Sequence, residues 1–395
     1  MRSASLSSNA KTALILGGGI GGVVVANELR RRLPRGDRVL VFERAEEHVF
    51  APSLLWLAIG DRAAGAIRAP LSRLLRHGIE VVHGSVEFID PLQRAVTANG
   101  ERYQGDAIVI ALGAQLAPQV IPGLEEAGHD VYTLEGALSL REALRVFRTG
   151  RIAVLTAAPL YKCPAAPYEA AMLIEYDCRR RGVRQDVSID VFAAEPGPMG
   201  VAGPAVSASV KAALGAKNIA YHPGRQVLGA DASGRRLTFT DGSTADYDLL
   251  VYVPPHRAPE VVVAAGLTDA TGWIPVNRNT LETTHAGIFA LGDVSTIPLS
   301  LGKPLPKAGV FAHAQAKVVA RNIVRAWTKR GKAAAFDGHG ACFVEVGDGR
   351  AAIGKGNFYA EPVPEVTLYP PSRLRHWAKV IFERTWLRRL FARLR

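Results

Sequence analysis

The segment TALILGGGIGG (12–22) decides the fold, because an apolar strand runs directly into a glycine-rich turn that opens a helix. Gly17, Gly19 and Gly22 fit the spacing G-x-G-x-x-G. Glycines let the backbone approach a diphosphate closely, and the free N–H groups at the start of a helix attract its negative charge. The segment therefore predicts a dinucleotide-binding site.

Glu43 supports this prediction. It ends the next apolar strand, RVLVFE (38–43), at roughly the offset where a carboxylate can accept hydrogen bonds from both hydroxyls of a ribose. By itself, the glycine-rich turn could still be a merely tight turn, and it could hold either NAD or FAD.

Two later segments favour FAD. THAGIFALGDVS (284–295) is an apolar strand that ends in Gly292 and Asp293. It resembles the motif with which flavoproteins of the two-dinucleotide superfamily return to the flavin, and there the aspartate lies near the ribityl chain. IALGA, which contains Ala111 and Gly113, resembles a second flavin motif of that superfamily.

A second strand–helix–strand unit begins at RIAVLT (151–156), but the turn that follows has no glycine. The stretch AAPLYKCPAAPYE (157–169) carries three prolines, which offer no N–H to a phosphate, so we expect that NAD(P)H is not bound. Cys163 occupies this turn, beside Lys162 and close to a helix start, a setting that favours the thiolate. Glu169 follows in the first turns of that helix and could exchange protons with a substrate. A buried structural cysteine and a solvent-facing glutamate are the alternatives.

The chain of 395 residues is 48% hydrophobic and 21% charged, which is typical of a folded protein with roughly two or three packed units. The strand and helix pattern predicts an α/β fold with two Rossmann-like dinucleotide-binding domains, the second inserted in the first, plus C-terminal amphipathic helices. The expected divisions are 1–115 for the first part of the FAD-binding domain, 116–284 for the second domain, 285–335 for the return of the first, and 336–395 for the C-terminal segment.

The net charge of +12 is concentrated in the tail, which argues against a role with nucleic acid. Residues 373–395 hold eight Lys or Arg and one acidic residue, so they carry +7. At helical spacing the tail has two apolar faces: Leu374, Trp377, Ala378 and Ile381 form the first, and Trp386, Leu387, Leu390, Phe391 and Leu394 form the second. The two faces point nearly opposite ways, so both could meet one surface only if the helix breaks near 383–386. We expect two short basic amphipathic helices on an anionic membrane surface, with packing on the body or on a second subunit as the alternative.

Several classes of protein are disfavoured. No apolar run reaches the ~18–20 residues that span a bilayer. The N-terminus, MRSASLSSNAK, lacks the apolar core of a secretory signal, so a cytoplasmic location is the default. Three cysteines are too few for a disulfide scaffold. The histidines show no ligand spacing, so we expect no metal.

Four segments together resemble the sulfide:quinone oxidoreductases, which are related to the flavoprotein subunits of flavocytochrome c sulfide dehydrogenase. They are FAPSLLW (50–56), YKCPAAPYEAAML (161–173), LPKAGVFAHAQAKVVARNI (305–323) and GACFVEVGDGRAAIG (340–354), and the likeness covers nearly the whole chain. It implies that Cys163 and Cys342 flank the flavin ring as a disulfide or sulfur-bridged pair. Many bacterial members have a third cysteine, which this chain lacks between 100 and 150, so a two-cysteine mechanism is implied. Cys178 matches no cysteine of the family, and we expect it to serve packing.

The resemblance also implies how the cofactor is held. FAD should be non-covalent, because the loop after Glu43 has no cysteine to attach it. Lys307 resembles a lysine near the pyrimidine edge of the flavin, where a cation stabilises the reduced ring; a solvated surface charge is the alternative. The expected cofactor-binding residues are Gly17, Gly19, Ile20, Gly21, Gly22, Glu43, Arg44, Val86, Ala111, Gly113, Gly292, Asp293, Lys307 and Ala308.

The implied reaction oxidises sulfide at the cysteine pair and passes two electrons to a lipid quinone, with Glu169 moving protons. Phe358, Tyr359 and Lys379 are the candidates for the quinone pocket. The resemblance implies a peripheral location on the cytoplasmic side of the inner membrane. The sequence does not decide whether the protein forms a homo-oligomer. The alternatives are a type II NADH:quinone dehydrogenase, a flavocytochrome-type sulfide dehydrogenase flavoprotein and a non-catalytic flavin-binding module.

Overall fold

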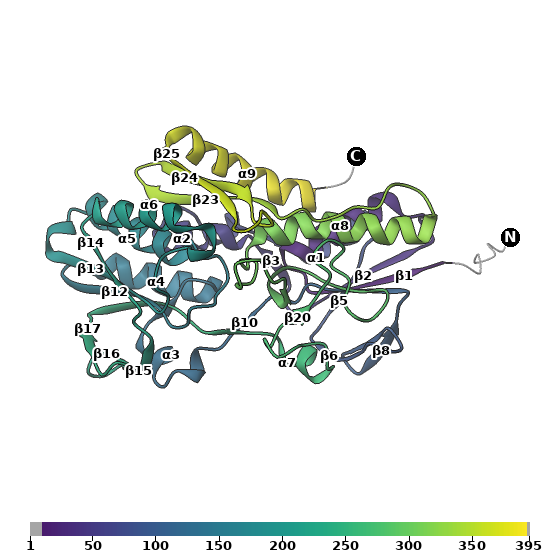
Figure 1. The fold of residues 1–395 in the computed structure, drawn as a ribbon, viewed down its shortest axis with the longest axis horizontal. Coiled ribbons are helices and arrows are strands. Elements are labelled where there is room, and N and C mark those ends of the chain that lie inside the picture. Colours follow the sequence, from purple (N-terminus) through teal and green to yellow (C-terminus); the bar gives the residue numbers. More distant parts are fainter. Residues whose placement is uncertain (1–9, 393–395) are drawn as a thin grey trace.

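The computed structural model describes residues 10–392, so the N-terminal segment 1–9 and Leu394 of the tail lie outside the described residues. Two five-stranded parallel sheets form its frame (Figure 1). The first sheet has the order β21-β9-β1-β2-β5, from β1 (Thr12–Leu16), β2 (Arg38–Glu43), β5 (Glu80–His83), β9 (Ala107–Ile110) and β21 (Ile288–Ala290). The second has the order β11-β18-β12-β13-β14, from β11 (His129–Asp130), β12 (Gly150–Thr156), β13 (Val187–Ala193), β14 (Ile219–Pro223) and β18 (Leu249–Val253).

The helices are α1 (Ile20–Arg32), α2 (Leu54–Ala58), α3 (Leu124–Ala127), α4 (Leu134–Val146), α5 (Ala166–Arg180), α6 (Pro204–Gly215), α7 (Glu260–Ala264), α8 (Gly309–Thr328) and α9 (Arg373–Phe391). The smaller sheets are β3 (Glu47–Val49) with β4 (Arg68–Pro70); β6 (Val86–Asp90), β7 (Ala95–Ala98) and β8 (Glu101–Gln104); β10 (Gln115–Leu116) with β19 (His256–Arg257); β15 (Val227–Asp231), β16 (Arg236–Phe239) and β17 (Thr244–Asp246); and β20 (Ile274–Pro275) with β22 (Ser295–Thr296).

The first sheet is buried on both faces, as expected of apolar strands in a parallel sheet. Ala13 and Ile15 of β1 point to the face that α1 and α8 cover, and Leu14 and Leu16 point to the face covered by β6, β7 and α7. Helices α1 and α8 pack closely, since a Cβ on Gly309 would lie 2.6 Å from Ile20 Cδ1.

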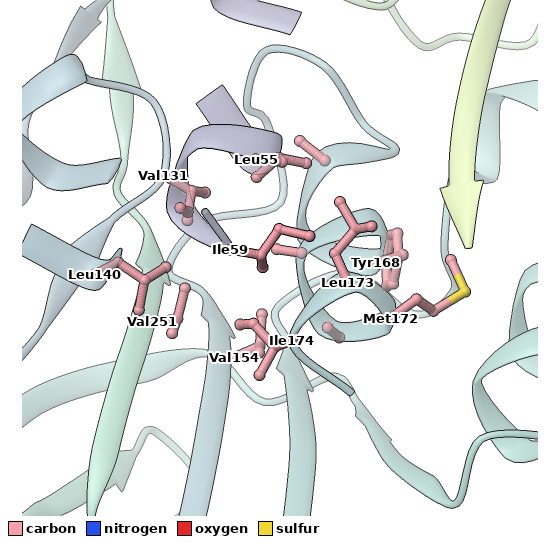
Figure 2. Packing of buried hydrophobic residues seen from close by; sticks show 14 of the residues in the cluster. Leu55, Ile59, Val131, Leu140, Val154, Tyr168, Met172, Leu173, Ile174 and Val251 are labelled. Atoms are coloured by element: carbon pink, nitrogen blue, oxygen red, sulfur yellow. The ribbon is translucent and has the colours of Figure 1, made fainter. Parts of the chain in front are cut away.

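The second sheet is covered by α2, α4 and α5, whose side chains form one apolar cluster with it. Figure 2 shows Leu140 of α4 facing Val154 and Val251 of the sheet, with Leu173 and Ile174 of α5 beside them. Burial of these side chains stabilises the unit by roughly 1.5–3 kcal/mol each. The second sheet lies in sequence between β9 and β21 of the first, so the predicted fold class, with one Rossmann-like unit inserted in another, is confirmed. The domain boundaries stay predictions.

The C-terminal part is an antiparallel sheet followed by α9, and the two lie together along one side of the molecule (Figure 1). The sheet consists of β23 (His339–Gly347), β24 (Arg350–Asn357) and β25 (Glu365–Ser372). Val344 and Val346 of β23 join the core around α5, whereas Trp386 and Leu390 of α9 join the core around α1.

Helix α9 is continuous from Arg373 to Phe391, so the predicted break near 383–386 is wrong. The two apolar faces do not share a surface. The second face packs on the body through Trp386, which is 5% exposed, and the first face is exposed at Trp377, which is 57% exposed. Glu383 fixes this orientation, because its buried carboxylate accepts hydrogen bonds from Ser53 Oγ (2.6 Å) and Arg62 Nε (2.9 Å). None of the helices within residues 10–392 is both long and apolar enough to cross a membrane.

Candidate functional site

The glycine-rich turn is packed so tightly that side chains are excluded from it. A Cβ on Gly22 would lie 1.8 Å from the carbonyl oxygen of Gly17, and a Cβ on Gly17, where φ is +104°, would lie 2.4 Å from that of Ala111. Gly21 is similarly confined by Leu291. Gly19 differs, because nothing lies within 4 Å of its Cβ position. It precedes α1 without a side-chain cap, so the first N–H groups of the helix can face a ligand in this open space.

Glu43 lies at the rim of this turn and is half-buried. Its Oε2 accepts from the amide of Gly18 (2.7 Å), and its Oε1 accepts from the amide of Ala45 (3.0 Å). Arg44 follows and is exposed, whereas Val86 begins β6 and packs on the first sheet.

Asp293 and Lys307 lie at the opposite end of the expected cofactor path. Lys307 is 5% exposed, its Nζ donates to the carbonyl oxygens of Asp293 (2.7 Å) and Ser295 (3.1 Å), and it lies 3.4 Å from the centroid of the Trp273 ring. Burial lowers the pKa of Lys307 to about 8. Burial also raises the pKa of Asp293. A solvated lysine, the alternative for Lys307, is therefore wrong.

These residues fit a bound FAD. Asp293 Oδ1 is buried and has no hydrogen-bond partner within residues 10–392. A buried acceptor without a donor costs free energy, so a hydroxyl of a ligand is expected to donate to it. Gly113 takes a φ of +70° and has nothing within 4 Å of its Cβ position, so the chain beyond β9 leaves room. Gly292 lies in a turn at φ +72° and its amide donates to Gln315 Oε1 (2.8 Å). Ala308 lies at the start of α8 and, with Gly292, lines a small cavity.

The structure brings Cys163 and Cys342 together, although they are far apart in sequence. Both are free and half-buried. Cys163 adopts a φ of +52°, its amide donates to the carbonyl of Lys307 (2.6 Å), and its carbonyl accepts from the amide of Ala166 (2.9 Å). Cys342 lies on β23, opposite Gly354 of β24.

The two thiols titrate as one pair. The hydrogen bond from Cys163 to Cys342 is the main cause that raises the pKa of Cys163 and lowers the pKa of Cys342. The hydrogen bond thus makes Cys342 the more acidic thiol of the pair, whereas the sequence setting favours the thiolate at Cys163. The reason is the partner thiol, which local sequence does not reveal.

Glu169 is buried beside this pair, so the solvent-facing alternative is wrong. Its Oε1 accepts from the amide of Glu345 (2.7 Å) and from Lys379 Nζ (3.2 Å). Burial lowers the pKa of Lys379, but the carboxylates of Glu169 and Glu345 outweigh it, so the net shift is upward. Lys379 lies 4.5 Å from the centroid of the Trp56 ring.

Sequence reasoning missed three residues of this cluster. Glu345 is a buried carboxylate whose Oε2 lies 3.0 Å from His376 Nδ1, and the ring of Trp56 lies beneath Lys379. A charged residue inside the apolar strand ACFVEVG was the available signal for Glu345. Helix α9 supplies His376 and Lys379 from its polar side, which faces inward.

The three quinone candidates do not form one cluster. Phe358 makes an edge-to-face contact with Phe311, at 5.0 Å between centroids. Tyr359 donates to the carbonyl of Arg278 (2.7 Å) and packs on Phe336. Lys379 contacts Glu169 and Trp56 instead.

Cys178 is fully buried in the core around α5, which confirms its predicted packing role. Residues 10–392 contain no group of three or more His, Cys, Asp or Glu side chains able to hold a metal ion.

Replacing Lys379 by methionine should raise the pKa of Cys342, because the ammonium group lowers it electrostatically. The alkylation rate of Cys342 near neutral pH should fall several-fold, measured on its peptide by mass spectrometry. Glu169→Gln should have the opposite effect and increase the alkylation rate of Cys342, since the carboxylate of Glu169 raises the pKa of Cys342. Lys332→Met, at an exposed position, is the control. Equal alkylation rates of Cys342 in the unaltered protein and the three variants would contradict this account of the cluster.

This fold and site define a class of oxidoreductases in which two Rossmann-like units hold a dinucleotide cofactor beside a pair of cysteines. The family model described as pyridine nucleotide-disulphide oxidoreductase matches residues 11–316, and the chain belongs to this family.

Among its relatives, the sulfide-quinone reductase of Aquifex aeolicus (strain VF5) is 29% identical, over 96% of this chain and 90% of the relative. The mitochondrial sulfide:quinone oxidoreductase of Mus musculus is 24% identical, over 90% of this chain and 80% of the relative. The solved structure of the sulfide:quinone oxidoreductase from Aquifex aeolicus superposes with a TM-score of 0.87 at 26% identity, covering 97% of this chain and 92% of that one. These findings confirm the resemblance identified from the four sequence segments.

Proposed function

We propose that this protein is an FAD-dependent sulfide:quinone oxidoreductase, which oxidises sulfide to sulfane sulfur at Cys163 and Cys342 and passes two electrons to a lipid quinone. The observation that carries the proposal is the hydrogen-bonded thiol pair, formed between a second turn without glycines and the C-terminal sheet. The named relatives over nearly the full chain length support it. The domain division at 115, 284 and 335 is part of the same proposal.

Bound FAD supplies a two-electron acceptor beside the cysteine pair. In our proposal the turn at Gly17–Gly22 and the start of α1 hold its diphosphate, and Glu43 accepts from its ribose. Asp293 completes its hydrogen bonds with a hydroxyl of the cofactor, and Lys307 provides a cation near the ring. The backbone can approach the cofactor closely at four positions with a small side chain or none: Ala111, Gly113, Gly292 and Ala308.

In the oxidised pair, hydrosulfide attacks one sulfur: the Cys163–Cys342 bond breaks, a persulfide S–S bond forms, and the other cysteine leaves as a thiolate. A thiol of lower pKa leaves faster, so Cys342 is the leaving group and the persulfide forms on Cys163. Lys379 stabilises the departing thiolate electrostatically. Glu169, in contact with Lys379, is positioned to take the proton of the hydrosulfide.

The proposal is tested by mixing the FAD-loaded protein with sulfide or with NADH in a stopped-flow spectrometer. Sulfide should bleach the flavin absorbance rapidly and NADH should not. Rapid bleaching by NADH would support a type II NADH:quinone dehydrogenase instead.

We also propose a peripheral membrane position, on the cytoplasmic side, and the outer face of α9 supports the membrane contact. Large apolar side chains are exposed on it: Leu374, Trp377 and Ile381 are 80, 57 and 59% exposed, and Phe382, at the edge toward the body, is 40% exposed. Exposed Arg373 and Arg384 flank these side chains, as on helices that lie in an anionic interface. Because the inner side of α9 supplies Lys379 to the cysteine pair, the same helix would link the membrane surface to the site.

The double variant Trp377→Ser/Ile381→Ser should weaken binding to anionic phospholipid vesicles roughly 10- to 100-fold, because two large apolar side chains are lost from the interface. Binding is measured by co-sedimentation. The matched control is Leu92→Ser/Leu228→Ser, at two exposed leucines distant from α9. If both double variants bind as well as the unaltered protein, α9 is not the membrane contact.

A further inference from the structure

Glu195 lies, in the second Rossmann-like unit, close to the position that Glu43 occupies in the first. Glu43 ends β2, and Glu195 follows β13, the strand that pairs with β12 up to Thr156 and Ala193. In a dinucleotide-binding unit, a carboxylate at this position accepts hydrogen bonds from a ribose. Glu195 is only 8% exposed.

Three hydroxyl groups of the chain itself donate hydrogen bonds to Glu195. Thr156 Oγ1 donates to Glu195 Oε2 at 2.7 Å. The phenol groups of Tyr161 and Tyr168 both donate to Glu195 Oε1. Three internal donors therefore take the place of ribose hydroxyls at the end of β13.

The two tyrosines flank Cys163. Tyr161 precedes it by two residues, and Tyr168 lies on the first turn of α5, where Figure 2 shows it among the core side chains beside Met172. Hydrogen bonds to one carboxylate just beyond the end of β13 therefore fasten both ends of the cysteine-bearing turn to the edge of the sheet.

This turn needs external support, because Cys163 adopts a φ of +52°, a left-handed conformation that L residues other than glycine rarely take. Two further hydrogen bonds also hold it. Tyr132 Oη donates to the carbonyl of Lys162 (2.7 Å), and the carbonyl of Lys307 accepts from the amide of Cys163 (2.6 Å).

We infer that Glu195 is a positioning residue for the redox pair: through Tyr161 and Tyr168 it holds Cys163 in the conformation that brings its thiol against Cys342. A carboxylate close to the place of a ribose-binding acid thus serves the cysteine turn, and three of its roughly four acceptor positions are taken by hydroxyl groups of the chain. This inference rests on the proposed redox role of the two cysteines.

The test uses Tyr161→Phe and Tyr168→Phe, each of which removes one hydroxyl and keeps the ring in the core. The matched control is Tyr247→Phe, a buried tyrosine of the same unit whose hydroxyl donates to the carbonyl of Asp231. In FAD-loaded protein with reduced cysteines, the pH dependence of iodoacetamide alkylation is measured separately for Cys163 and Cys342.

The unaltered protein and the control should show two well-separated titrations. In Tyr161→Phe, the alkylation profile of Cys342 should move to higher pH and that of Cys163 to lower pH. A change of about one pH unit corresponds to a tenfold change in thiolate fraction below the pKa. The rate of flavin reduction at saturating sulfide should fall in the same variant, with little change in KM.

Unchanged titrations combined with a lower melting temperature would overturn the inference, because a purely structural role affects stability alone. Suppose that sulfide reduces the flavin in none of the proteins, but that the two cysteine titrations lie closer together in Tyr161→Phe than in the unaltered protein. The inference about Glu195 then stands, and the proposed substrate is wrong.

Discussion

Replacing Cys163 by serine should slow the reduction of bound FAD by sulfide by roughly 10³-fold or more, because the sulfur that forms the persulfide is gone and a serine hydroxyl cannot replace it. The rate is measured by stopped-flow absorbance under anaerobic conditions. Serine is nearly isosteric with cysteine, so the turn at φ +52° and its ties to Lys307 and Ala166 should persist.

Cys178→Ser is the matched control, because it removes the third thiol of the chain, which lies in the core near the C-terminal end of α5, whereas Cys163 precedes the start of this helix. It should keep the sulfide rate within about twofold while losing some stability, as expected for a polar substitution in a core. Sulfide reduction that survives Cys163→Ser would exclude the cysteine pair as the site of sulfide oxidation.

Replacing Gly22 by alanine should remove most of the FAD from the purified protein. Its Cβ would lie 1.8 Å from the carbonyl oxygen of Gly17, so strand β1 and helix α1 must separate, which costs about 1–3 kcal/mol of stability. FAD content is measured by the ratio of flavin to protein absorbance, and stability by urea unfolding of the apoprotein.

Gly19→Ala separates a ligand effect from a fold effect. Because nothing lies within 4 Å of that Cβ position, the apoprotein should lose less than about 1 kcal/mol, yet FAD affinity should fall if the diphosphate occupies the space in front of α1. Gly36→Ala, which is also unhindered but lies away from this turn, should change neither quantity. Full FAD affinity in Gly19→Ala would exclude this turn as the diphosphate site.

Much of the fold could be predicted because its signals are local. The glycine-rich turn, the apolar strands and the Gly292–Asp293 segment each carry their information within a dozen residues, and a parallel sheet buried on both faces requires such apolar runs. The fold class and the family resemblance were therefore accessible without coordinates.

The candidate site was accessible only in part. Cys163 was identified because it stands in the turn where a second dinucleotide site would need glycines, Glu169 because it lies at the start of the helix that follows, and Cys342 because its segment resembles a known family. Glu195 was missed although it lies just beyond a strand of the second unit, because the phenols that donate to it belong to a turn whose conformation the sequence does not display.

The tail illustrates the same limit. Periodicity located two apolar faces correctly, but the prediction assumed that both faces meet one surface. The buried Glu383–Arg62 ion pair and the docking of Trp386 hold a continuous helix with one face inward and the other exposed. The opposite sides of one helix can serve two environments, and only the surrounding structure decides which side faces which.

The sequence by itself determined that this chain builds one glycine-rich dinucleotide turn, lacks the second, and places a cysteine there instead. These features can be read from the sequence because a tight turn requires glycine, and a buried strand requires apolar residues, at particular positions. The tertiary structure alone decided which thiol of the pair is the more acidic, which carboxylates surround Lys379, and which face of α9 is exposed. Each of these depends on charges and dipoles brought within a few ångströms from distant parts of the chain, and such electrostatic effects are set by distance in space and burial.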